Sequence, residues 1–204
     1  MADTAAAPDV AWDLDPLVDG EGAAGVARLL KEADERAAAF QERYAGKVAE
    51  LDGSGLAEAV AELEAISDSA GRAAVYASLR FSVDTADPEN GALLAQVQEQ
   101  STQIETKLLF FELEWAALDD DQVEALLGAD GLDRVQHYLR STRRYRPHLL
   151  SEPEERIIAE TSVSGADAWR RLFSEVTSST EVPLDGHAGP GPLVDHEVSL
   201  RIQQ

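Results

Sequence analysis

Cysteine is absent from the 204 residues of this chain. Without thiols the chain can form neither disulfides nor a thiolate nucleophile, and Cys-based zinc sites are excluded. Long apolar runs are also missing, because no stretch of about 18 apolar residues occurs. The first ten residues, MADTAAAPDV, lack the basic start and the apolar run of a signal peptide. These absences predict a cytoplasmic protein.

Basic side chains are scarce. Only 17 Lys and Arg, three of them Lys, stand against 39 Asp and Glu, which gives a formal net charge of -22. Such a charge repels phosphate backbones and anionic lipid surfaces. We therefore expect no nucleic-acid partner and no membrane partner.

One segment, RSTRRYRPH at 140–148, runs against this acidic background. It contains Arg140, Arg143, Arg144, Arg146 and His148. Cations suit the C-terminal end of a helix dipole and can pair with the acidic residues that follow. We interpret the cluster as such a helix end, and an anionic ligand or the carboxylates of a partner are the alternative.

Recognisable catalytic patterns are missing. His196-Glu197 begins like the zinc-protease motif HExxH, but no second His follows one helical turn later. The four His residues fall in separate segments, at 137, 148, 187 and 196. Glu112 and Glu114, beside Trp115, are interpreted as a polar helix side with an interhelical hydrogen bond. The sequence predicts no catalytic, cofactor-binding or metal-binding residue in this chain.

Apolar residues recur at steps of three and four, which is the period of amphipathic helices. One stripe predicts a long helix: Val26, Leu30, Ala33, Ala37, Phe40 and Tyr44. A second stripe covers 56–66, and a separate third segment is expected at 68–84. Helix is expected to predominate through residue 176.

The strongest predicted element follows Asp87-Pro88, because Asp caps a helix and Pro fits its first turn. Its apolar residues keep heptad spacing as far as Leu118. Phe110 and Leu113 widen the stripe, so this helix is expected to be central. Shorter helices are expected to follow it, one of them opened at Ser151 by a capping box with Glu154.

The last 28 residues alternate like strands around a Gly- and Pro-rich loop. We therefore expect a mainly α fold, a multi-helix array of long antiparallel helices with a small C-terminal β-hairpin. Residues 1–20 are expected to be irregular and 21–178 to form the helical domain. Residues 179–204 are expected to form the hairpin and loop, with truncation left open.

Four segments resemble the N-terminal region of the oligoendopeptidase F family of zinc metallopeptidases, which are thimet-oligopeptidase-like. They are YASLRFSVDTADPE (76–89), LFFELEWAALDD (109–120), YLRSTRRYRPHLLSEPEERI (138–157) and SGADAWRRLFSE (164–175). The resemblance implies a helical, cytoplasmic enzyme that cleaves short peptides in a channel. Its zinc-binding HExxH would lie beyond the matched region, and this sequence contains none.

The resemblance thus implies a non-catalytic N-terminal region that forms part of a channel wall and is inactive alone. Its partner would be the catalytic C-terminal region of the same peptidase or another copy of the chain. Uncovered apolar surface is expected around Phe110, Leu113 and Trp115, and at the hairpin. The alternative is a stand-alone acidic helical module that binds a protein through the 108–118 face or the arginine cluster.

Overall fold

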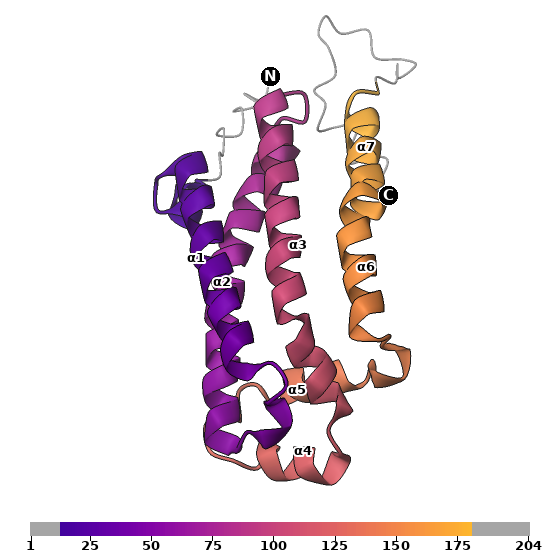
Figure 1. Cartoon of the computed structure of the whole chain (residues 1–204). Coiled ribbons are helices and arrows are strands. Elements are labelled where there is room, and N and C mark those ends of the chain that lie inside the picture. Colours follow the sequence, from indigo (N-terminus) through magenta and orange to yellow (C-terminus); the bar gives the residue numbers. More distant parts are fainter. Residues whose placement is uncertain (1–12, 181–204) are drawn as a thin grey trace, which may run out of the picture.

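A computed structural model describes residues 13–180 of the chain. Three long helices form its main body: α1 (Gly22–Tyr44), α2 (Gly53–Val83) and α3 (Pro88–Ala117). They run antiparallel side by side, and short 3-10 turns at Asp15–Val18 and Val48–Glu50 flank α1 (Figure 1). The described residues are therefore mainly helical, as predicted. The expected hairpin at 179–204 lies almost entirely outside the described residues.

The remaining helices continue from the end of α3. The short helices α4 (Asp120–Leu127) and α5 (Gln136–Arg143) close one end of the bundle. A 3-10 turn at Arg146–His148 leads into α6 (Glu152–Ser164), and α7 (Ala166–Ser178) continues almost in line with it. Figure 1 shows α6 and α7 as an outer layer running back along α3.

The predicted stripe of α1 supplies one side of the core. All six of its residues are buried, and Phe40 packs against Phe110 and Phe111 of α3 with ring centroids 5.8 and 5.6 Å apart. Aromatic pairs at such separations favour tilted and edge-on contacts over face-to-face stacking. The α1–α3 packing is therefore built around this aromatic cluster.

The separation of 56–66 from 68–84 was wrong, because α2 is one continuous helix. Gly71 lies within it, and a Gly in a helix interior costs only about 1 kcal/mol relative to Ala. Ile66 and Ala73, on either side of Gly71, are both fully buried. Burial on both sides of the glycine outweighs its low helix propensity.

The predicted start of α3 is confirmed, and α2 begins with a cap of the same kind. The Asp52 carboxylate accepts from the Gly55 amide at 2.8 Å, and the Asp87 carboxylate accepts from the Glu89 amide at 2.9 Å. Each cap satisfies an amide that has no partner inside its helix. The helix α3 then contacts α1, α2, α5 and α6. The prediction that it is central is confirmed.

Candidate functional site

The linker from α5 to α6 contains the most strongly marked helix start in the sequence, and its predicted capping box is present. The Glu154 carboxylate accepts from the Ser151 amide at 3.0 Å and from the Ser151 hydroxyl at 2.5 Å. These two bonds lower the pKa of Glu154. Glu155 accepts from the Leu150 amide at 2.9 Å. The carboxylates of Glu154 and Glu155 therefore fix the direction in which the chain enters α6.

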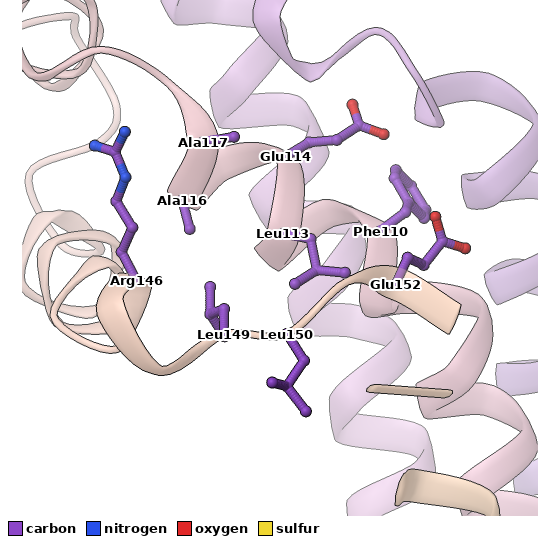
Figure 2. A pocket seen from close by; sticks show the side chains of 9 residues that line it. All are labelled: Phe110, Leu113, Glu114, Ala116, Ala117, Arg146, Leu149, Leu150 and Glu152. Atoms are coloured by element: carbon purple, nitrogen blue, oxygen red, sulfur yellow. The ribbon is translucent and has the colours of Figure 1, made fainter. Parts of the chain in front are cut away.

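A hollow of about 440 Å³ opens on one side of this linker (Figure 2). Its apolar lining comes from the end of α3 and from the linker itself, with charged groups at its edge. The lining residues are Phe110, Leu113, Glu114, Ala116, Ala117, Arg146, Leu149, Leu150 and Glu152. In Figure 2, Leu149 points toward Ala116. The hollow suits an apolar side chain and shows no arrangement for acid–base chemistry.

Glu114, at the edge of this hollow, has a structural role. Its carboxylate accepts from the amides of Gly46 at 2.7 Å and Val48 at 3.2 Å, which lie between α1 and α2. Glu112 accepts from the Tyr138 hydroxyl at 3.3 Å. Both carboxylates therefore make the contacts between elements that were predicted for them.

On another side of the linker lies a groove that we call the Glu112 groove. It consists of two hollows, of about 450 and 480 Å³, that share Glu112 and Glu155. The first is lined by Leu63, Ser67, Glu105, Thr106, Leu108, Leu109, Glu112, Tyr138, Glu155, Ile158 and Ala159. The second is lined by Glu112, Ser141, Thr142, Tyr145, His148, Leu149 and Glu155.

This groove was not predicted from the sequence. Glu105 and Glu112 flank Leu108 and Leu109 at helical spacing, which places all four toward one side of α3. That spacing was a usable signal, but 39 acidic residues in the chain made any single carboxylate uninformative. The contribution of Glu155 from α6 depends on tertiary packing.

The arginine cluster serves mainly internal contacts. Arg143, whose side chain is only 10% exposed, donates to the carbonyls of Trp115 and Leu118, both at 2.7 Å, and pairs with Asp120 at 2.6 Å. Arg140 pairs with Glu124 at 2.8 Å. The cations therefore neutralise the C-terminal end of α3 and the acidic start of α4. The cluster does end a helix, α5, but its ion-pair partners Asp120 and Glu124 precede it in the chain, and within the described residues the cluster forms no pair with the acidic residues 152–155.

The zinc implied by the resemblance does not fit the described residues. Between residues 13 and 180, no three His, Cys, Asp or Glu side chains are grouped so that they could hold a metal ion. His137 lies 3.4 Å from the Ser141 hydroxyl, and His148 is exposed at the end of the Glu112 groove. His187 and His196 lie outside the described residues.

The expected apolar surface around Phe110, Leu113 and Trp115 is largely buried. Phe110 and Trp115 are 4% and 1% exposed, because α1 and α5 cover them. Phe111 and Leu118 are buried as well. The 108–118 face therefore belongs mainly to the core, and it is not the free binding surface that the sequence analysis proposed.

Large exposed apolar side chains lie instead on α2, α6 and α7, and α7 carries the exposed aromatic residues Trp169 and Phe173. The apolar residues of α7 share one side of the helix and form what we call the α7 stripe: Trp169, Leu172, Phe173 and Val176. Trp169 and Phe173 are 69% and 68% exposed. The opposite side of α7 carries Asp167, Arg171 and Ser178, which are partly buried, and Ser178 lies 2.8 Å from the Thr85 hydroxyl. The helix thus directs its polar side inward and its apolar side outward.

Within residues 13–180, no helix is long and apolar enough to cross a membrane. Exposed apolar stripes like that of α7 mark surfaces that other protein segments cover.

Comparison with known proteins gives a consistent result. The model of the Oligopeptidase F family matches residues 114–181, which include α4 to α7. Oligopeptidase PepF of Bacillus subtilis (strain 168) is 27% identical over 121 residues, or 59% of this chain and 18% of that protein. This chain therefore corresponds to a minor part of its curated relative.

Solved structures share the fold. Oligoendopeptidase-F from Enterococcus faecium is similar at a TM-score of 0.66 and 22% identity, over 89% of this chain and 34% of that one. A putative peptidase from Chlamydophila abortus is similar at a TM-score of 0.56 and 20% identity, over 96% of this chain and 34% of that one. Together with the sequence matches, these structures confirm the resemblance read from the sequence: the chain corresponds to the N-terminal region of oligoendopeptidase F-like peptidases.

Proposed function

We propose that this chain forms part of the wall of the substrate channel in a zinc-dependent oligopeptidase of the oligoendopeptidase F kind. The observation that carries this proposal is the α7 stripe. It lies within the residues that the family model matches, yet the bundle leaves it uncovered. The solved relatives are about three times as long as the region they share with this chain.

The occupant proposed for the α7 stripe is the catalytic region of the same peptidase. Trp169 and Phe173 are large aromatic side chains of the kind that dominate binding energy at interfaces. The polar side of α7 already faces the bundle. Rotating the helix to bury the apolar stripe would therefore move Asp167 and Arg171 away from the bundle, with no new hydrogen-bond partner for either side chain. An incoming apolar surface would cover the stripe without such a rotation.

In this proposal the zinc and the general base come from the catalytic region. This chain supplies shape, because it contains no HExxH and its described carboxylates and histidines form no group that could hold a metal ion. A rigid wall restricts which substrates can reach a reacting centre. The chain alone is then inactive toward peptides.

The proposal is tested by reading the coding sequence near this chain for an HExxH segment, in frame or in an adjacent gene. The two parts are then produced together, and hydrolysis of a quenched fluorescent peptide is measured with and without phenanthroline. We expect phenanthroline-sensitive cleavage only when both parts are present. The double variant Trp169→Ser, Phe173→Ser should weaken association of this chain with the catalytic part. Val83→Ser is the control, because Val83 is an exposed apolar residue at the end of α2, and it should leave the association unchanged.

The absence of an HExxH segment, or two parts that neither associate nor cleave, would contradict the proposal. Those results would favour the stand-alone acidic module, with the α7 stripe as its binding surface. Self-association of the chain would be a third use of the same stripe. Light scattering across a salt series detects it, because added salt screens the repulsion between chains of charge -22.

A further inference from the structure

The Glu112 groove combines an apolar lining with three carboxylates and, unlike the hollow beside the α5–α6 linker, has no Arg in its lining. Its floor is formed by Leu63 of α2, Leu109 of α3 and Ile158 of α6. These side chains come from α3 and from the two helices that pack against it, and they line a hollow of about 450 Å³. The groove can therefore accept apolar side chains of an extended ligand.

The carboxylates of the groove are only partly used by the protein itself. Glu112 accepts one hydrogen bond from the Tyr138 hydroxyl, and Glu155 accepts one from the Leu150 amide. Glu105 has no hydrogen bond or ion pair within the described residues. Because a carboxylate can accept about four hydrogen bonds, most of this capacity remains open to a ligand.

Among residues 13–180, no Lys or Arg lines this groove to balance the carboxylates. His148 lies only at the far end. Partial burial and the carboxylates of Asp167 and Glu112 raise the pKa of Glu105. Burial and Glu112 likewise raise the pKa of Tyr138 to about 12. Burial is the larger cause of both shifts, and the neighbouring carboxylates add a negative potential that a cationic ligand would relieve.

We propose that the Glu112 groove binds short peptides that carry an Arg or Lys beside apolar residues. The basic side chain lies among Glu105, Glu112 and Glu155, and the neighbouring apolar side chains contact Leu109 and Ile158. An Arg guanidinium suits this position best, because its planar donors can bond two carboxylates in fixed geometry. This inference rests on the proposed function, since it names the class of peptide that the channel would prefer.

The test uses the full chain and two fluorescein-labelled octapeptides. One contains two Arg residues among Leu and Ala, and the other has Gln at the Arg positions. Fluorescence anisotropy measures binding at about 0.1 M salt, where charges beyond about 10 Å are screened. We expect the Arg peptide to bind about tenfold more tightly than the Gln peptide, a typical worth of one charge-assisted contact.

Matched variants separate the groove from the general acidity of the chain. Glu105→Gln should weaken binding of the Arg peptide severalfold and leave the Gln peptide unchanged. Glu160→Gln removes the same charge from an exposed position of α6 outside the groove and should change neither. Ile158→Ala should weaken both peptides. Circular dichroism confirms that each variant is folded.

Equal affinities for the two peptides, or equal losses in Glu105→Gln and Glu160→Gln, would overturn the inference. Assembly with a catalytic region is measured separately, so the two proposals can fail independently. If the assembled enzyme cleaves peptides but shows no preference for Arg peptides, only the proposed role of the Glu112 groove is contradicted. If the groove binds Arg peptides but no catalytic partner is found, only the proposed peptidase function is contradicted.

Discussion

The α1–α3 bundle and the α6–α7 layer place their apolar residues in opposite ways. The bundle buries Phe40, Phe111 and Trp115 almost completely, whereas neither α6 nor α7 contains a fully buried residue. Both regions have helices with clear amphipathic spacing. The difference shows that the core of the described residues lies in the bundle, whereas α7 directs its apolar side chains outward, where our proposal places another surface.

The two tryptophans give the largest expected contrast. Trp115 is buried and donates its indole N–H to the Leu139 carbonyl at 2.9 Å, whereas Trp169 is mostly exposed. Trp115→Ala should lower the free energy of unfolding by about 3–5 kcal/mol, because it leaves a cavity and removes the buried indole hydrogen bond. Trp169→Ala should change it by less than about 0.5 kcal/mol.

Urea denaturation followed by circular dichroism measures both changes. Similar losses for the two variants would show that α7 belongs to the core, and would break the comparison of the two regions.

Arg143 tests how the bundle end is held. Arg143→Met removes the donors to the Trp115, Ala116 and Leu118 carbonyls, and should cost about 2 kcal/mol. Arg144→Met is the matched control, because Arg144 is exposed and makes no ion pair within the described residues. Thermal denaturation compares the two. A loss at Arg144 as large as that at Arg143 would indicate general charge repulsion as the cause.

The Ser151 cap tests whether the outer layer unfolds together with the bundle. Ser151→Ala removes the hydroxyl that bonds Glu154 and should destabilise α6 by about 1 kcal/mol, whereas Ser151→Thr should retain most of the cap. If α6–α7 unfolds first, only the early part of the urea transition should shift. A uniform shift of one transition would show that both regions unfold as a single unit.

Substitution of Gly71 is expected to change the free energy of unfolding least, and to raise it. A Cβ built at Gly71 meets no atom within 4 Å, and the residue lies inside the continuous helix α2. Gly71→Ala should therefore stabilise the chain by about 0.5–1 kcal/mol. Gly53→Ala is the contrasting variant, because its Cβ would lie 2.1 Å from the Ala129 Cβ. Destabilisation by Gly71→Ala in a thermal melt would imply a break in α2.

The sequence by itself determined the helix periods and the capped helix starts. Asp52, Asp87 and Ser151 act on amides two or three residues away, so local sequence is sufficient to specify them. The buried stripe of α1 follows from its spacing in the same way. The family resemblance was also readable, because it resides in short segments of the chain.

Tertiary structure alone decided three other features. It joined the two expected segments of α2 across Gly71, and it turned the apolar side of α7 away from the bundle. It also brought Glu155 of α6 beside Glu112 of α3. Each depends on contacts between residues far apart in the chain, whose free energies exceed the local preferences that a sequence pattern records.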